Sequence, residues 1–95
     1  MMIRWLDDAI NDLQSLRHYI AQDNVVAARK VVKKTLGTIG ILSEQPGMGR
    51  PGRVANTREL IVSGTPYIVP YRVKNNTIEI LRVFHCAMQW PEDIE

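Results

Sequence analysis

"RELIVSGTPYIVPYRVKNNTIEILRVFH", residues 58–85, decides the fold, because it holds three short apolar segments separated by two turn signals. The segments "RELIV", "YIVPYRVK" and "TIEILRVFH" have the pattern of β-strands and occupy residues 58–62, 67–74 and 77–85. Between them, "SGTP" is typical of a turn, and "NN" suits a tight turn with positive φ. Strands joined by such short connections pair side by side, so the stretch predicts an antiparallel meander.

The middle segment alternates, which puts one set of apolar side chains on a single face: Tyr67, Val69, Tyr71 and Val73. Pro70 interrupts the segment because proline has no N–H to donate, which predicts a bend, a bulge or a sheet edge at that point. In the last segment Ile78 and Ile80 face one way. Leu81 and Val83 face the other, so this strand is predicted to be central.

Upstream of the strands the apolar period lengthens to three or four residues, which is typical of helices. The first helix is predicted over residues 7–21, on the stripe Leu6, Ala9, Ile10, Leu13, Leu16 and Ile20. Asp23 or Asn24 is predicted to cap a second helix that ends near Glu44, because Pro46 follows. Its stripe consists of Ala28, Val32, Thr35, Leu36, Ile39 and Leu42.

Gly37 and Gly40 fall inside the second helix, where each costs roughly 1 kcal/mol relative to alanine. Their spacing favours a close approach by another backbone. The loop "PGMGRPGR" at 46–53 follows, and "MIRW" at 2–5 is typical of a short strand. The chain is therefore predicted to be a single α+β domain over residues 1–95, in the order β-α-α-β-β-β. A helical hairpin packs on one face of a small antiparallel sheet.

The composition is that of an ordinary globular domain, with 45% hydrophobic and 23% charged residues among 95. The lone Cys86 excludes an intrachain disulfide and fits a reducing cytoplasm. No signal peptide is expected, because "MMIRWLDDAINDL" turns acidic before an apolar run develops, and no membrane span is expected. No cofactor is expected either.

Charge is distributed unevenly along the chain. Residues 29–82 hold ten Lys and Arg against three Glu, a net charge of +7, whereas residues 1–28 carry −2 and residues 83–95 carry −3. A basic middle suggests an anionic partner, either a nucleic acid or an acidic protein segment. For the cations of "RKVVKK" at 29–34, a solvated helix face explains the pattern equally well.

His85 and Cys86 are adjacent, which suggests a catalytic pair or metal ligands. Neighbouring strand residues point to opposite faces, however, so the two side chains are not expected within hydrogen-bond reach. Zinc needs about four ligands, and the chain has no second Cys, so no metal site is expected. Cys86 is predicted to be a plain small apolar side chain, whereas His85 lies at a strand end and is either a functional or a structural histidine.

Five arginines are the other candidates for a binding site: Arg50, Arg53, Arg58, Arg72 and Arg82. Guanidinium groups on an open sheet face can bind phosphates or carboxylates, and Arg72 and Arg82 are expected on adjacent strands. The alternative is ordinary ion pairing with Glu59 and Glu79 of the same strands. Trp90 follows the last strand and is expected to pack over the sheet or to meet a partner.

The chain resembles the RelE/ParE superfamily of bacterial toxins from type II toxin–antitoxin modules, and within it the ParE-like branch. The resemblance covers nearly the whole chain, through Trp5, Ala9, Asp12, Leu13, Leu16, "YIAQDN", Ala27 and Ala28, then "LSEQPGMGRPGRV", "TRELIV", "PYIVPYRV" and "ILRVFHCAMQWP". It implies the same α+β fold, a cytoplasmic location and inhibition by a cognate antitoxin in a hetero-oligomer. ParE-like members of plasmid stabilization modules poison DNA gyrase, whereas RelE-like members cleave mRNA on the ribosome.

The residues bear on the choice between these two activities. Cleavage of RNA without a metal needs an acid–base pair and cations for the developing charge. The ribonuclease branch carries an Arg at the position similar to Ile68, and an Arg or Tyr at the position similar to Cys86. It also carries a functional Tyr near the C-terminus, whereas no Tyr follows Tyr71 in this chain. Arg58 and His85 do match that branch.

The leading hypothesis is a gyrase inhibitor that uses the five arginines, His85 and Trp90 to bind its target or antitoxin. The alternative is an endoribonuclease that places Arg58 and Arg72 or Arg82 on the phosphate, with His85 as general acid or base. A third possibility is a member that still binds its antitoxin but no longer harms cells.

Overall fold

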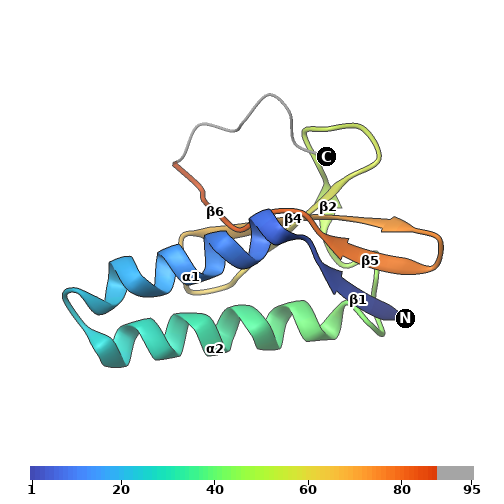
Figure 1. Ribbon diagram of the computed structural model, residues 1–95. Helices are drawn as coiled ribbons and strands as arrows, with labels where there is room; N and C mark the ends of the chain where they lie inside the picture. Colours follow the sequence, from blue (N-terminus) through green and yellow to red (C-terminus); the bar gives the residue numbers. More distant parts are fainter. Residues whose placement is uncertain (88–95) are drawn as a thin grey trace.

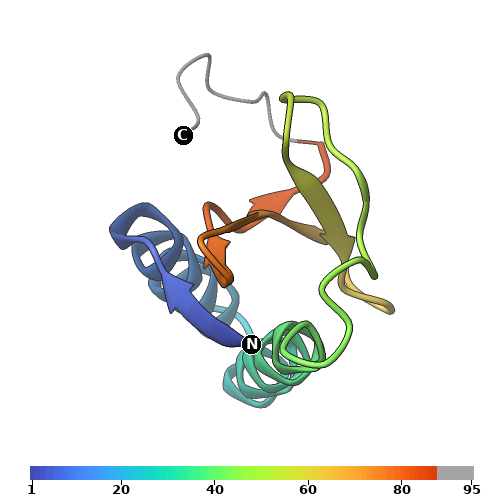
Figure 2. The same cartoon turned by 90° about the vertical axis from the view of Figure 1, so that its right-hand side faces the viewer.

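The computed structural model describes residues 1–87 and has two layers (Figure 1). One layer is a hairpin of two helices, and the other is a six-stranded sheet. Both helices lie on the same side of the sheet (Figure 2). The predicted α+β fold, a helical hairpin on one sheet face, is confirmed.

The helical hairpin consists of α1 (Asp7–Ala21) and α2 (Val25–Ile41). The bounds of α1 are those predicted from the apolar stripe. Asn24 caps α2, since its side-chain oxygen accepts a hydrogen bond from the Ala27 N–H at 3.0 Å. The second helix ends three residues before Glu44. There the chain tightens into a turn, in which Ser43 N–H donates to Gly40 O at 3.3 Å and the Ser43 hydroxyl to the same oxygen at 3.0 Å.

The sheet has the strand order β1-β5-β4-β3-β2, and β6 also pairs with β4. Its strands are β1 (Met2–Trp5), β2 (Arg50–Pro51), β3 (Arg58–Ile61), β4 (Tyr67–Lys74), β5 (Thr77–Ile80) and β6 (Phe84–His85). The predicted meander of β3, β4 and β5 is antiparallel, as expected. The sheet as a whole is mixed, however, because β1 pairs in parallel with β5. Side-chain periodicity carries no information about strand direction, so the prediction of a purely antiparallel sheet was wrong at this edge.

The turn between β4 and β5 has the predicted backbone. Asn75 and Asn76 have φ angles of 53° and 59°, the left-handed values of a two-residue hairpin turn. The turn fixes the register in which Lys74 lies opposite Thr77 and Arg72 opposite Glu79. Arg72 and Glu79 are therefore neighbours on one face of the sheet.

The predicted last strand is interrupted by a β-bulge. Tyr71 pairs with Ile80 and Ile68 pairs with Phe84, so three residues on one strand oppose two on β4. Pro70 lies opposite the bulge, in a central strand, and its carbonyl accepts from Leu81 N–H at 2.9 Å. A strand residue directs its N–H and C=O to the same side of the strand. At Pro70 that side faces the bulge, so proline lacks its N–H where the hydrogen-bond ladder is already interrupted.

The bulge shifts the facing of the residues that follow it. Val83 belongs to the same core cluster as Ile78 and Ile80, so its predicted place on the opposite face was wrong. Leu81 is buried but does not belong to this cluster. The extra residue of the bulge therefore turns Val83, an odd-numbered residue, toward the core. A prediction from strict alternation cannot anticipate this change.

The core fills the space between the sheet and the helical hairpin. Its buried cluster comprises Ala9, Leu16, Ile39, Leu42, Leu60, Val62, Tyr67, Val69, Tyr71, Ile78, Ile80 and Val83. Two members of the predicted helical stripes are exposed, since Ile10 and Leu36 are 40% and 45% exposed. Within residues 1–87, the close backbone approach predicted at Gly37 and Gly40 is also absent. A side chain added at either glycine would meet nothing within 4 Å.

Candidate functional site

The sheet face opposite the helices carries two ion-pair clusters. In the first, the buried carboxylate of Glu59 accepts from Arg50 Nε at 3.3 Å and Nη2 at 3.1 Å. It also accepts from the Arg53 backbone N–H at 2.9 Å, and Arg53 Nε lies 3.9 Å away. The cluster ties the loop that follows β2 to β3, because residues 50 and 53 are both bound to one strand residue.

In the second cluster, Glu79 of β5 lies between two arginines. Its carboxylate accepts from Arg72 Nε at 2.6 Å and from Arg4 Nη1 at 3.2 Å. The hydrogen bond from Arg72 holds the pKa of Glu79 below its ordinary value, and the charges of Arg72, Arg4 and Lys74 act in the same direction against the effect of burial. Glu79 is therefore a stable anion and a poor general base.

Arg82, in the bulge, is bound to α1. The Asp12 carboxylate accepts from Arg82 Nε at 2.7 Å and Nη2 at 3.0 Å, and from the Val83 backbone N–H at 2.9 Å. The Arg82 guanidinium also stacks over the Phe84 ring at 4.6 Å. Asp12 thus connects the helix to the bulge through a bidentate pair and a main-chain bond.

Arg58 has no carboxylate partner within residues 1–87. Its Nη1 instead donates to the backbone oxygens of Gly49 at 2.7 Å and Gly47 at 3.4 Å. The same loop is bound by Tyr71, whose hydroxyl accepts from Gly49 N–H and donates to Pro46 O, both at 2.8 Å. Gly49 is needed there, because an added Cβ would lie 2.7 Å from the Tyr71 ring. The loop that carries Arg50 and Arg53 is therefore fixed at its base.

His85 lies at the opposite end of β4 and is exposed. Its Nδ1 accepts from Ala87 N–H at 3.1 Å, and its ring meets Tyr67 edge-on, with centroids 5.6 Å apart. Burial raises the pKa of Tyr67, and the nearby Tyr19 raises it further, so Tyr67 is a weaker acid than an ordinary tyrosine. Cys86 is exposed and forms no disulfide, and its assignment as a plain small apolar side chain stays a prediction. It follows β6 directly, where the sheet has ended.

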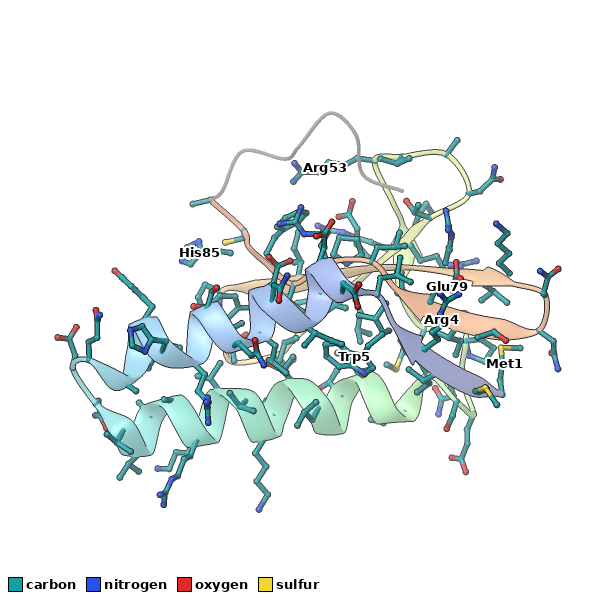
Figure 3. The ribbon with its side chains drawn as sticks, viewed as in Figure 1. Met1, Arg4, Trp5, Arg53, Glu79 and His85 are labelled. Atoms are coloured by element: carbon teal, nitrogen blue, oxygen red, sulfur yellow. The ribbon has the colours of Figure 1, made fainter. Side chains whose placement is uncertain are left out.

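The structure brings some of the predicted site residues together and separates others. Arg58 and Arg72 line one pocket, at the end of β4 remote from His85. His85 pairs with Tyr67, five residues from Arg72 along β4, a separation of about 17 Å at the usual rise of a strand. Figure 3 shows His85 well apart from Glu79, the partner of Arg72. Trp90 lies outside the described residues.

The alternative of ion pairing with Glu59 and Glu79 holds for Arg50, Arg53 and Arg72. Arg82 pairs instead with Asp12 of α1, and Arg58 lacks a carboxylate partner in the described chain. Among residues 1–87, no three His, Cys, Asp or Glu side chains lie close enough to hold a metal ion. Neither helix of the described chain has the length and apolar character that a membrane crossing requires.

The side of the helical hairpin that faces away from the sheet, which we call the hairpin surface, differs from the sheet side in how its cations are paired. Within residues 1–87 its cations form no ion pairs: Arg17, Arg29, Lys30, Lys33 and Lys34. They border two shallow grooves that meet at Lys33 and Gly37. One groove, of about 580 Å³, contains Val32 and Leu36, and the other, of about 410 Å³, contains Ile41.

Sequence reasoning left this hairpin surface open between a binding face and a solvated one. The signal that could have identified it is the combination of "RKVVKK" with Gly37 and a surplus apolar residue, Leu36, on one side of the helix. A solvated helix face seldom combines unpaired cations with exposed apolar side chains and a gap in the side-chain layer.

Comparison with known proteins agrees with the fold and covers nearly the whole chain. A family model described as "ParE toxin of type II toxin-antitoxin system, parDE" matches residues 3–90. The proposed toxin Y4kP of Sinorhizobium fredii is 42% identical over 90 residues, which is 95% of this chain and 93% of that one. Toxin RelE2 of Caulobacter vibrioides is 34% identical over 83 residues, 87% of this chain and 92% of that one.

Two solved structures are also similar. A chain from the chromosomal ParDE toxin–antitoxin system of P. aeruginosa has a TM-score of 0.80 and 31% identity, over 90% of this chain and 95% of that one. A chain from the toxin–antitoxin complex RelBE2 of Mycobacterium tuberculosis has a TM-score of 0.57 and 29% identity, over 88% and 95%. The likeness is stronger to the ParDE chain in both overlap and identity.

Proposed function

Because this chain belongs to the ParE toxin family of type II toxin–antitoxin systems, we propose that it inhibits growth by binding DNA gyrase. The observation that carries this proposal is the separation of the candidate catalytic groups. His85 is about 17 Å along β4 from Arg72, and an acid–base group must be within hydrogen-bond reach of the proton that it moves. The cationic groups are thus better suited to binding than to cutting.

The ion pairs support the same conclusion. Glu59, Glu79 and Asp12 are the carboxylates bound to the candidate arginines, and each is held by a guanidinium group. An ionised carboxylate with a lowered pKa is a weak base, so Glu79 does not replace the missing catalytic partner of His85. The arginines form a rigid charged surface of the kind used in recognition.

A supercoiling assay with purified gyrase tests the proposal. Inhibition of supercoiling, or accumulation of cleaved DNA–gyrase complexes, is expected when toxin is added in excess. The Arg50→Glu/Arg53→Glu double variant should weaken the effect, whereas Lys74→Glu serves as a single charge reversal outside the loop. Gyrase that stays fully active at large excess of a folded toxin would rule the proposal out.

A second candidate activity is RNA cleavage, which the identity to toxin RelE2 favours. Arg82 lies close to His85 in the chain and stacks over Phe84. Arg82 and His85 would therefore be the reacting pair. The Asp12 clamp on Arg82 argues against this role, because it occupies two of the guanidinium donors. If His85→Ala abolishes toxicity and induced cells show mRNA cut at defined codon positions, cleavage replaces gyrase binding as the function.

We also propose where the cognate antitoxin binds. The unpaired cations and apolar grooves of the hairpin surface suit an acidic amphipathic segment, whose apolar side chains would cover Val32, Leu36 and Ile41. A strand of the partner could add at the outer edge of β3, since β2 pairs only with Arg58 and Glu59. The segment would order on binding.

A pull-down or titration with the antitoxin encoded beside the toxin gene tests this surface. Lys33→Glu, at the meeting point of the grooves, should weaken the complex by about tenfold or more, as expected for a buried interfacial charge reversal. Lys74→Glu carries the same charge change on β4 and should leave affinity within about twofold. Equal losses in both variants would contradict the assignment. Normal growth on expression of the toxin alone would indicate a member that has lost its toxicity.

A further inference from the structure

We propose that the tip of the helical hairpin binds a carboxylate that is carried on an apolar group. The turn between α1 and α2 lies at the end of the molecule remote from the N-terminus (Figure 1). Next to this turn is a pocket of about 240 Å³, the tip pocket, to which both helices contribute. Its lining consists of Arg17, His18, Ala21, Val25, Ala28 and Arg29. None of these is a candidate catalytic residue, so the proposal is independent of the gyrase and ribonuclease hypotheses.

Arg17 and Arg29 lie at the same height on the two helices. Arg17 comes about one helical turn before the last residue of α1, and Arg29 comes about one turn after the first residue of α2. Because the helices of a hairpin run antiparallel, the two arginines stand on opposite sides of the groove between them. Both line the tip pocket and also the adjoining groove of about 580 Å³, and among the described residues only these two are shared. A single anion at this junction would contact both guanidinium groups.

The charge of the two arginines is not balanced by the described chain. Within residues 1–87 neither forms an ion pair, and Asp23 of the connecting turn forms none either. The first turn of α2 has no acidic residue, so the positive end of the helix dipole adds to the local charge. Two like charges at one height repel each other, and an anion between them removes that repulsion. The hairpin tip would take this anion from outside the described chain.

The end of the tip pocket nearest the turn is apolar. Ala21 ends α1 and Val25 begins α2, whereas Ala28 is buried at the base of the helix pair. Val25 is 55% exposed, so an apolar group of a ligand would cover surface that is now open to water. His18 is exposed and supplies the remaining polar group of the lining.

This arrangement distinguishes a carboxylate from a phosphate. A carboxylate has both oxygens at one end of a carbon skeleton, where each guanidinium fork can donate to them. Its apolar part then points toward Ala21 and Val25. A phosphate has oxygens on all sides, and those turned toward the apolar wall would lose their hydration without a donor in return. A free carboxylic acid and an acidic side chain beside an apolar one in a bound protein share the chemistry that the pocket selects.

Nuclear magnetic resonance with sodium butyrate tests the proposal. Compared with sodium chloride at equal ionic strength, butyrate should cause saturable shifts of the Ala21, Val25 and Ala28 amides. Butylammonium chloride has the same apolar chain with the opposite charge and should cause none. Arg29→Gln should raise the Kd for butyrate about tenfold or more, the usual effect of losing hydrogen bonds to a charged group. Lys74→Gln makes the same change of charge on β4 and should leave the Kd unchanged. Shifts that do not saturate, or an equal loss in both variants, would overturn the proposal.

A second variant tests the apolar end of the pocket without a change of charge. Ala21→Leu replaces one good helix former by another and should fill the space next to the turn, so it should weaken the binding of butyrate. An unchanged circular dichroism spectrum shows that the variant is folded. Acetate, which lacks the apolar chain, should bind less tightly than butyrate to the parent. If acetate binds equally well, the apolar part of the proposal is refuted.

The antitoxin encoded beside the toxin gene distinguishes the two sources of the carboxylate. If the Arg17→Gln/Arg29→Gln double variant loses affinity for both butyrate and the antitoxin, an acidic side chain of the antitoxin occupies the tip pocket. If the double variant loses affinity for butyrate alone, the ligand is a free acid. Both results support the site. A parent protein that shows no binding of butyrate refutes it, whatever the outcome of the antitoxin and gyrase assays.

Discussion

At the scale of the residue, Tyr71 shows how one side chain serves both the core and the loop. Its ring is fully buried between the helices and the sheet, and its hydroxyl bonds two main-chain groups of the loop after α2. Both bonds are long-range, joining β4 to residues more than twenty positions earlier. Tyr71 therefore couples the position of Arg50 and Arg53 to the packing of the core.

Tyr71→Phe removes both bonds and leaves the Gly49 N–H and Pro46 C=O without this partner. We expect the free energy of unfolding to fall by about 1–3 kcal/mol. Urea denaturation followed by circular dichroism measures the change. Tyr67→Phe is the matched control, because the Tyr67 hydroxyl makes no hydrogen bond within residues 1–87, and it should stay within about 0.5 kcal/mol of the parent. Equal losses in the two variants would contradict the role of the Tyr71 hydroxyl.

Glu79 gives the molecule a predictable response to acid. Its pKa in the folded state is depressed below that of an ordinary glutamate, chiefly by the hydrogen bond from Arg72. A depressed carboxyl pKa contributes stability above the unfolded pKa, and this contribution is lost as pH falls through the folded pKa. Glu79→Gln should therefore be less stable than the parent at pH 7. The difference should shrink from about pH 4.3 downward. A gap that stays constant down to pH 2 in urea titrations would refute the coupling.

At the scale of the element, the two glycines inside α2 make the helix less stable than alanines would. Gly37 and Gly40 lie inside the helix with open space where a side chain would be. Gly49, by contrast, lies in the loop after α2, where the Tyr71 ring fills the space that a side chain would need. The same substitution should thus have opposite effects in the helix and in the loop.

Gly40→Ala should stabilise the protein by about 0.5–1 kcal/mol, from better helix propensity and a less flexible unfolded chain. Gly49→Ala should destabilise it by about 1–3 kcal/mol, because the ring or the loop must move. Thermal unfolding of both variants against the parent measures the two effects. A destabilised Gly40→Ala variant would show that a close contact exists at that helix position after all.

The elements also show what the sequence can and cannot predict. Apolar period and capping residues determine α1 and the start of α2, because helix formation depends on local chain properties. The paired asparagines predict the β4–β5 turn for the same reason. The bulge opposite Pro70 and the parallel pairing of β1 depend on contacts between distant segments, which no local pattern records. The candidate arginines were identified, but their separation into the Arg58–Arg72 pocket and the Asp12 clamp required the three-dimensional register.

At the scale of the whole molecule, positive charge occurs in two forms on opposite sides. Arginines of the sheet side are largely neutralised by Glu59, Glu79 and Asp12, whereas the hairpin surface has five cations without ion pairs in the described chain. Internal ion pairs fix the shape of a surface, while unpaired cations attract a partner over longer distances. The two sides are accordingly suited to different kinds of contact.

Binding of the antitoxin should therefore depend strongly on salt. Raising sodium chloride from 0.05 to 0.5 M shortens the screening length, and we expect the association rate to fall by about tenfold or more. Stopped-flow mixing at several salt concentrations measures this dependence. The Lys30→Gln/Lys33→Gln/Lys34→Gln triple variant should lose most of it. A salt dependence that the triple variant retains in full would place the steering charges elsewhere.

The parallel edge of the sheet has a consequence for the order in which the chain folds. Met2 pairs with Thr77, so β1 is made first but has no partner strand until the chain has grown by about 75 residues. Closing so long a loop is slow compared with forming a local helical hairpin. During synthesis, α1 and α2 can therefore associate while the sheet is still incomplete. Docking of β1 is expected to be a late step of folding, after the surface of the hairpin has already become available to a newly made partner.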